Sequence, residues 1–140
     1  MTLAAMPMLT CRSVPASSEW YQRVLGLVSV HGGDEYDQLA SVGPDGPTTV
    51  LQLHRVDAHE HPALLTADQP LGGNGAVVWF ETIAYGAALA TLRSALADGV
   101  AVTVLEDDHV NPVANHREFW LADPDGYRVV VSSPHGATDL

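Results

Sequence analysis

The order of the expected secondary-structure elements repeats once along the chain, and this repeat limits the possible folds more than any other feature. In the first half, an extended apolar segment over 6–12 precedes a helix that begins after Ser13 and stops at Gly26. Alternating apolar positions between turn residues then predict three strands, over 27–30, 36–42 and 48–56.

The second half predicts the same order with little shared residue identity. A β-rich run over 76–81 precedes a helix that Thr82 can cap and that Gly99 ends. Three more strands are expected after this helix, over 100–105, 118–122 and 127–132. A repeated element order of this kind indicates a duplicated module.

We therefore expect an α+β fold in which two βαβββ modules form a curved mixed sheet around a ligand cup. Module 1 covers about residues 4–57, module 2 covers about 75–134, and a connector with Pro and Gly residues over about 58–74 joins them in one domain, 1–140. A helix against one face of each sheet leaves the opposite face available for a small molecule.

Two motifs resemble the signatures of a known superfamily. The segment 17–27, SSEWYQRVLGL, has an aromatic pair before a Leu-Gly helix end, and the segment 119–127, FWLADPDGY, carries an Asp-Pro-Asp-Gly turn. Both are similar to the glyoxalase, bleomycin-resistance and extradiol-dioxygenase (vicinal oxygen chelate) superfamily, and together they cover the two ends of the doubled module. The resemblance implies the cup-shaped fold and a homodimer.

The resemblance also implies where a metal would bind, because metal-dependent members place ligands on the first and last strands of each module. Carried over from the matched motifs, those positions fall on Met6, Gln52, Val77 and Val130. Three of these side chains lack the nitrogen or oxygen donors that a divalent cation needs, and Gln52 alone is insufficient. We therefore predict a member that lacks the usual metal ligands and uses no metal or other cofactor.

Composition narrows the choice of partners and compartment. Seventeen acidic and six basic residues give a net charge of −11, which disfavours nucleic acid and anionic membrane surfaces and would attract a cationic small molecule. The chain has no apolar run near the roughly 20 residues that span a bilayer, no recognisable signal peptide in residues 1–9, and one cysteine, Cys11. These features predict a cytoplasmic protein.

Strand alternation predicts which side chains line the cup. Gln52 and His54 lie two residues apart and should point to the same face of their strand. In the strand 118–122, one register turns Glu118 and Trp120 inward and the other turns Phe119 and Leu121 inward, and alternation alone leaves both open. The predicted ligand-binding residues are Met6, Met8, Gln52, His54, Val77, Trp79, Trp120, Arg128 and Val130.

Several histidines are candidates for chemistry in this sequence. His54 could act as a general base or bind a ligand, and we pair it with Glu118 as the predicted catalytic residues. His59 and His61, in the connector, could coordinate a metal ion, although a His-x-His pair in an acidic loop is more often simply solvated. The segment 111–115 is expected to be a loop that could close over the mouth of the cup.

Three functions remain open on these residues. The first is metal-free sequestration of a small aromatic or cationic molecule, such as an antibiotic. The second is a lyase, isomerase or dioxygenase of the same superfamily, using general acid–base chemistry at His54 and at Glu118 or Glu81, or a metal bound elsewhere. The third is an interaction module whose cup is filled by bulky side chains such as Met6 and Trp79.

Overall fold

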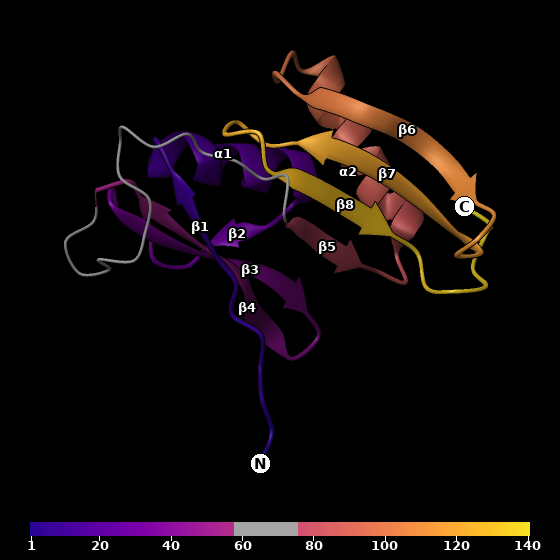
Figure 1. Ribbon diagram of the computed structural model, residues 1–140, viewed down its shortest axis with the longest axis horizontal. Coiled ribbons are helices and arrows are strands. Elements are labelled where there is room, and N and C mark those ends of the chain that lie inside the picture. The colour runs from indigo at the N-terminus through magenta and orange to yellow at the C-terminus, as the bar shows by residue number, and fades with distance from the viewer. Residues whose placement is uncertain (58–75) are drawn as a thin grey trace. The chain divides into compact units, whose positions relative to one another are not determined.

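The computed structural model describes residues 1–57 and 76–140, and the chain divides into two compact units, Met1–Leu71 and Gly72–Leu140. Unit 1 contains β1 (Met8–Cys11), α1 (Val14–Leu25), β2 (Val28–Ser29), β3 (Tyr36–Gly43) and β4 (Gly46–Arg55). Unit 2 contains β5 (Val77–Glu81), α2 (Tyr85–Ala97), β6 (Thr103–Asn111), β7 (His116–Ala122) and β8 (Arg128–Ser132) (Figure 1). Each unit therefore has the element order that the sequence repeat predicts.

The two sheets share one topology. The strand order is β1-β4-β3-β2 in unit 1 and β5-β8-β7-β6 in unit 2. In each sheet the first strand pairs parallel with the last strand of its unit, and the remaining pairs are antiparallel. The sheets are mixed, so the predicted α+β fold of two βαβββ modules is confirmed.

Local sequence signals set the ends of α1. The Ser13 side chain accepts a hydrogen bond from the Ala16 N–H at 3.2 Å, and Gly26 takes the left-handed conformation that ends the helix, with φ of 71°. The helix packs its apolar side against β3 and β4. The buried side chains that join α1 to the sheet are Val14, Tyr21, Val24, Leu39, Leu51 and Leu53.

Helix α2 covers one face of the unit 2 sheet (Figure 1). The ring centroid of Tyr85, at the start of this helix, lies 5.8 Å from the ring centroid of Phe119 on β7. The helix begins three residues after Thr82, so the prediction that Thr82 is its N-cap is wrong. Ala84 occupies the cap position, and the Thr82 hydroxyl instead accepts the Ala84 N–H at 3.0 Å.

Strand β6 differs most from the sequence-based expectation, because it runs through an acidic triplet that disfavours strands. Two of these acidic side chains have basic partners in other elements of the unit. Asp107 binds Arg93 of α2 at 2.6 Å, and Asp108 binds Arg117 of β7 at 2.6 Å. Strand β6 pairs with β7 as far as Asn111, six residues beyond the predicted end at Leu105, and these ion pairs offset the repulsion among its acidic side chains.

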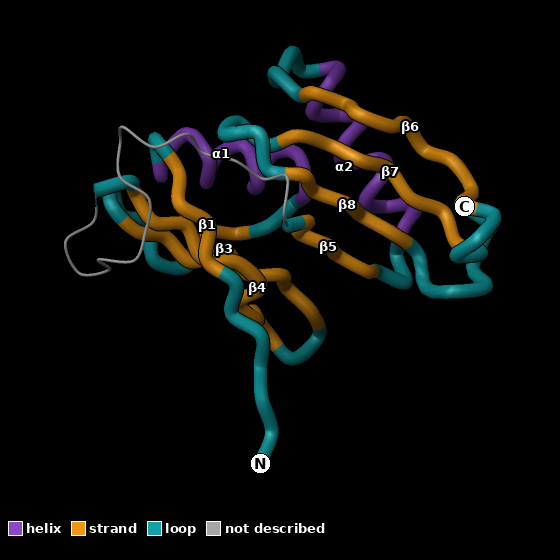
Figure 2. The backbone as a smooth tube through the Cα atoms, viewed as in Figure 1, coloured by secondary structure: helices purple, strands orange, loops and turns teal. Residues whose placement is uncertain are grey.

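The segment 111–115 is a tight connection between β6 and β7, visible in Figure 2 as a short loop. The Asn111 side-chain oxygen accepts the N–H groups of Val113 and Ala114, at 3.0 and 3.1 Å. Asn115 has a φ of 55°, a conformation that asparagine tolerates better than most residues. The segment is thus a compact turn, which leaves little free chain to close over a pocket.

Candidate functional site

The face of the unit 2 sheet opposite α2 carries the residues with the most distinctive chemistry. Phe119 is fully buried and packs against Tyr85 of the helix, so its neighbours Glu118 and Trp120 point to the other face. This settles the register that the sequence left open. Across the strands, Trp79 and Trp120 both pair with Val130.

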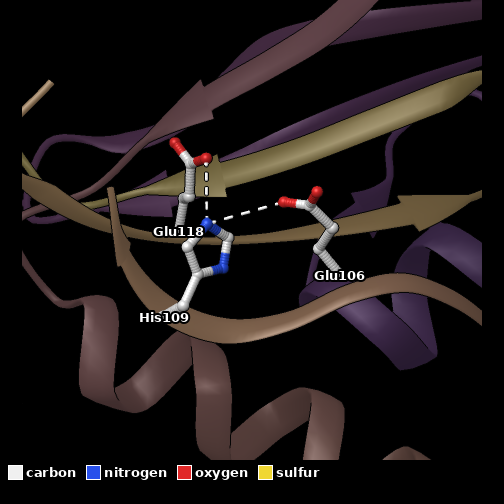
Figure 3. A group of neighbouring side chains, drawn as sticks. All are labelled: Glu106, His109 and Glu118. Carbon is white, nitrogen blue, oxygen red and sulfur yellow. Dashed lines mark ion pairs between the residues drawn. The ribbon is translucent and has the colours of Figure 1, made fainter. Parts of the chain in front are cut away.

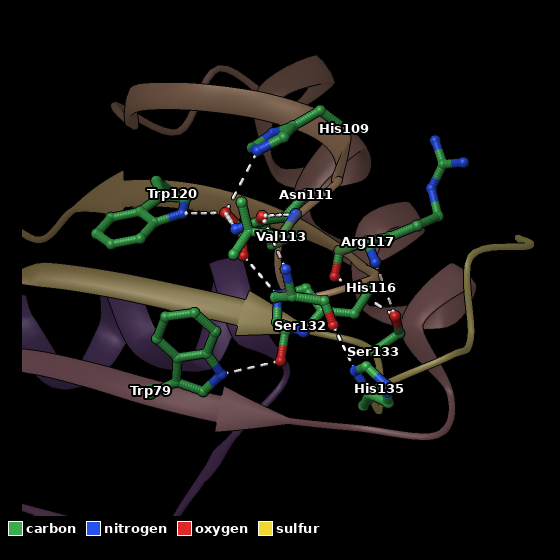
Figure 4. A network of polar contacts seen from close by, with 12 residues as sticks. Trp79, His109, Asn111, Val113, His116, Arg117, Trp120, Ser132, Ser133 and His135 are labelled. Atoms are coloured by element: carbon green, nitrogen blue, oxygen red, sulfur yellow. Dashed lines mark hydrogen bonds and ion pairs between the residues drawn. The ribbon is translucent and has the colours of Figure 1, made fainter.

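Glu118 is the centre of a polar network on this face, and its side chain is almost completely buried. Its carboxylate accepts hydrogen bonds from His116 Nε2 at 2.6 Å, Trp120 Nε1 at 3.0 Å and Asn111 Nδ2 at 3.2 Å. Figure 4 shows the donors His116, Trp120 and Asn111 together with His109. The His109 Nε2 atom lies 3.3 Å from Glu118 Oε1. The network therefore satisfies a carboxylate that would otherwise be costly to bury.

The electrostatics of the network keep Glu118 charged. Burial alone would raise the pKa of this carboxyl, but the hydrogen bonds from His116, Trp120 and Asn111 outweigh burial and lower it. The pKa of His109 is raised, because its ring donates to the Asp107 carbonyl and faces the carboxylates of Glu118 and Glu106. Glu118 is consequently an anion that orients its neighbours, and it is poorly suited to donate a proton.

Trp79 lies beside this network on β5. Its indole N–H donates to the Ser132 hydroxyl at 2.9 Å, and its ring lies 5.9 Å from the Trp120 ring in an edge-to-face arrangement. The His116 ring is 5.8 Å away. Trp79 is nevertheless 46% exposed, so a rigidly held aromatic surface faces outward.

The other predicted residues of unit 2 are less prominent. Val77 is half exposed at the start of β5. Val130 of β8 is fully buried, and its strand lies between β5, which carries Trp79, and β7, which carries Trp120. Arg128 turns back along the chain, where its guanidinium donates to the Gly126 carbonyl at 2.7 Å. Glu81 is exposed on β5, two residues after Trp79 and therefore on the same face.

The predicted residues of unit 1 form a separate polar group. Gln52 pairs with Met8 in register and accepts a hydrogen bond from the Tyr36 hydroxyl at 2.6 Å, while its own amide donates to the Met6 carbonyl at 2.9 Å. His54 is buried, with its ring 5.7 Å from Tyr36. Met6 is half exposed and precedes β1.

The structure groups the predicted site residues within each unit. Met6, Met8, Gln52 and His54 belong to unit 1, whereas Val77, Trp79, Glu118, Trp120, Arg128 and Val130 belong to unit 2. A cup built from residues of both units and a catalytic pair of His54 with Glu118 stay predictions. His59 and His61 lie outside the described residues.

Comparison with known families identifies the chain. The profile of the Glyoxalase/Bleomycin resistance protein/Dioxygenase superfamily matches residues 4–131, which is most of the sequence. The chain belongs to this superfamily. No curated protein sequence matches it significantly.

Solved structures of this kind of fold are similar along nearly the whole length. An integron cassette protein from the mobile metagenome of V. cholerae has 23% identity over 95% of this chain and 97% of that chain, with a TM-score of 0.63. A protein of unknown function from Agrobacterium tumefaciens has 19% identity over 95% and 94%, with a TM-score of 0.70. A glyoxalase-related enzyme from Fulvimarina pelagi has 16% identity over 95% and 88%, with a TM-score of 0.69. At these identities the similarity concerns the fold alone.

The four positions at which the superfamily resemblance places metal ligands carry few side-chain donors for a metal. Met6, Val77 and Val130 offer no nitrogen or oxygen side-chain donor, and both polar atoms of the Gln52 amide are engaged by Tyr36 and Met6. The lack of a metal site stays a prediction for these positions. It does not extend to the whole chain, since Glu106, His109 and Glu118 form a group with metal-ligand chemistry in unit 2.

Sequence reasoning did not select Glu106, His109, Asn111 or His116 for the site. The signal available was the density of acidic, imidazole and amide side chains between 106 and 118. Their convergence depends on how far β6 extends and on its irregular pairing with β7, and a strand predicted to end at Leu105 contains none of the three residues Glu106, His109 and Asn111. Among residues 1–57 and 76–140, no helix is both long and apolar enough to cross a membrane.

Proposed function

We propose that this superfamily member binds a small planar aromatic molecule carrying positive charge, on the unit 2 face that holds Trp79, Trp120 and Glu118. The observation that carries the proposal is the state of Trp79, which is 46% exposed although its N–H is fixed to Ser132. Natural-product antibiotics with a cationic aromatic group belong to this ligand class. Binding of this type requires no metal.

The ring arrangement supports stacking of an aromatic ligand. A ring already held by a hydrogen bond and by an edge contact with Trp120 loses little freedom when a ligand stacks on it. Tryptophan is also the best aromatic partner for a cation, because its π-face carries partial negative charge. Trp79 therefore favours a flat cation over a flat neutral molecule.

The charges nearby support the same preference. The Glu81 carboxylate is exposed on the face of Trp79, and Glu118 remains ionised within the network. The net charge of −11 adds a field that raises the local concentration of cations. An anionic aromatic ligand would meet repulsion from the same groups.

Titration calorimetry with three probes of similar shape tests the proposal: proflavine as the planar cation, anthracene-9-methanol as the neutral compound and anthracene-9-carboxylate as the anion. We expect proflavine to bind best, and Trp79→Ala to weaken its binding at least about fivefold, since stacking on an aromatic side chain contributes roughly 1–3 kcal/mol. Ile83→Ala is the matched control, because Ile83 is 95% exposed in the turn after β5. Equal binding to wild type and Trp79→Ala, or no binding of any probe, would contradict the proposal.

An enzymatic function is a second candidate, favoured by the 2.6 Å contact between His116 and Glu118. A carboxylate that accepts one ring N–H fixes the tautomer and leaves the other ring nitrogen to act as a base. We expect such an enzyme to exchange an acidic C–H of a bound carbonyl compound with deuterated water. Exchange that is the same in wild type and His116→Ala, over a panel of 2-oxo acids and 2-oxo aldehydes, would exclude this role of His116 for those compounds.

We also propose a homodimer on the basis of superfamily membership. Sedimentation velocity over a range of protein concentrations should give a species with twice the mass of the chain. A single species with the mass of one chain at all concentrations would contradict this proposal.

A further inference from the structure

Glu106, His109 and Glu118 project toward one another from two neighbouring strands of unit 2 (Figure 3). In a regular strand, residues three apart point to opposite faces, so Glu106 and His109 should not meet. The pairing of β6 with β7 is irregular between them: Glu106 pairs with Trp120 and His109 with Glu118, so three steps on β6 match two on β7. The extra residue turns both side chains to the same face.

The spacing of the three donor atoms suits a small divalent ion. His109 Nε2 lies 3.3 Å from Glu118 Oε1 and 3.5 Å from Glu106 Oε2. Zn²⁺ with bonds of about 2.0–2.1 Å to nitrogen and oxygen places tetrahedral ligands about 3.3–3.4 Å apart. All three ligand atoms lie within 4.8 Å of one another, so small side-chain rotations would complete the geometry.

The surroundings of His109 and Glu118 already hold them in the orientation that a metal requires. The Nδ1–H of His109 donates to the Asp107 carbonyl at 2.8 Å, which orients the ring with Nε2 toward the two carboxylates, so that a metal ion could replace the Nε2 proton. Glu118 is fixed by hydrogen bonds from Asn111, His116 and Trp120. Residues outside the three ligands thus supply the supporting hydrogen bonds that metal ligands commonly have.

We propose that Glu106, His109 and Glu118 form a binding site for a divalent transition-metal ion, with Zn²⁺ as the best-matched ion. One imidazole and two carboxylates are donors of the right type, and three protein ligands leave a fourth position for water or for an oxygen atom of a small molecule. None of these three residues is among the four positions, Met6, Gln52, Val77 and Val130, at which the resemblance places metal ligands. The metal-site proposal goes beyond the ligand-binding proposal and does not depend on it, because the metal alone is the probe.

The test is metal binding by the full chain after treatment with a chelator. We expect calorimetry to show a Zn²⁺ site that His109→Ala and Glu106→Gln each weaken at least about tenfold, which is the minimum that disturbing a metal site usually costs. Co²⁺ should give the visible absorption bands of a four-coordinate site in wild type, and these bands should be lost in both variants. Glu106 is exposed, so its substitution should leave the fold intact.

Matched controls separate this site from other histidines and carboxylates. His135→Ala removes an exposed imidazole that contacts the Ala114 carbonyl, and Glu19→Gln removes an exposed carboxylate on α1. Both should bind Zn²⁺ as wild type does. The proposal would be overturned if wild type showed no Zn²⁺ binding at micromolar concentrations, or if His109→Ala and Glu106→Gln bound the ion as the controls do.

Discussion

The two units of this superfamily member have the same strand order but present different chemistry on the sheet face that their helix leaves uncovered. In unit 1, the Tyr36 hydroxyl donates to Gln52 at 2.6 Å and accepts from Gln38 at 2.8 Å, so neutral groups satisfy one another. In unit 2, the corresponding network surrounds the ionised Glu118, and the half-exposed Trp79 lies beside it. The duplicated backbone thus carries one neutral face and one charged, aromatic face.

Each unit contains a buried carboxylate that accepts several hydrogen bonds, and these two carboxylates lie on different faces of their sheets. Asp37 of unit 1 lies on the side of β3 that faces α1, where the Ser18 hydroxyl of the helix donates to it at 2.6 Å. Glu118 of unit 2 lies on the face away from α2. We infer that the first carboxylate stabilises the fold and that the second serves the site.

The largest expected effect is on stability, from Asp37→Asn. This carboxylate also accepts the Ser29 hydroxyl at 2.9 Å and the Gly32 N–H at 2.7 Å, and an amide cannot accept all of these bonds. We expect the free energy of unfolding to fall by about 3 kcal/mol, as measured by urea denaturation. The exposed Asp34→Asn is the control, and proflavine affinity of the folded variant should not change.

The pH dependence of stability provides a second test of Asp37. Burial acts to raise its pKa, but the hydrogen bonds from Ser18, Gly32, Ser29 and Gln38 prevail and lower it. The stabilisation is therefore present above the unfolded-state pKa, near 3.8, and is lost as the pH falls through the lower folded-state value. Urea unfolding between pH 7 and pH 2 should show a steeper acid loss for wild type than for Asp37→Asn. Parallel curves would contradict a charged, structural Asp37.

Trp120→Phe should have a smaller effect that distinguishes unit 2. It keeps an aromatic ring but removes the N–H that donates to Glu118, so we expect stability to fall by about 1.5 kcal/mol. Proflavine affinity should fall severalfold, because the smaller ring reduces the edge-to-face contact that Trp79 makes with residue 120. Trp20→Phe, in α1 of unit 1, is the control and should leave proflavine affinity unchanged.

The smallest effect is expected for Tyr36→Phe in unit 1. Loss of the hydroxyl leaves Gln52 and Gln38 without their shared partner and should cost about 1 kcal/mol of stability. Proflavine and Zn²⁺ affinities should match wild type. A clear loss of either affinity would show that the neutral face of unit 1 takes part in binding, and the contrast between the units would fail.

The elements that could be predicted from the sequence are those whose signals are local. Ser13 and Gly26 mark the ends of α1 through short-range capping, and the Asp-Pro-Asp-Gly segment marks the turn before β8. Strand β6 could not be predicted in the same way. Its acidic residues are stabilised by Arg93 and Arg117, which lie 14 and 9 residues away in sequence.

The site could be predicted only in part, for a related reason. Strand alternation correctly predicted that Glu118 and Trp120 share one face of β7, but not which face this is. The packing of Phe119 against Tyr85 of α2 shows that Glu118 and Trp120 lie on the face away from the helix. The grouping of Glu106 with His109 depends on an irregular strand pairing that reverses the alternation rule. Such pairing depends on the partner strand, so the spacing of residues in β6 does not reveal it.

The most direct test of the contrast between the two units is a proflavine titration followed by NMR of the three tryptophan indole N–H signals. We predict that the signals of Trp79 and Trp120 shift together with added proflavine and that the signal of Trp20 stays in place. Shifts confined to Trp20 and to backbone amides around Tyr36 and His54 would contradict the claim that the binding face belongs to unit 2.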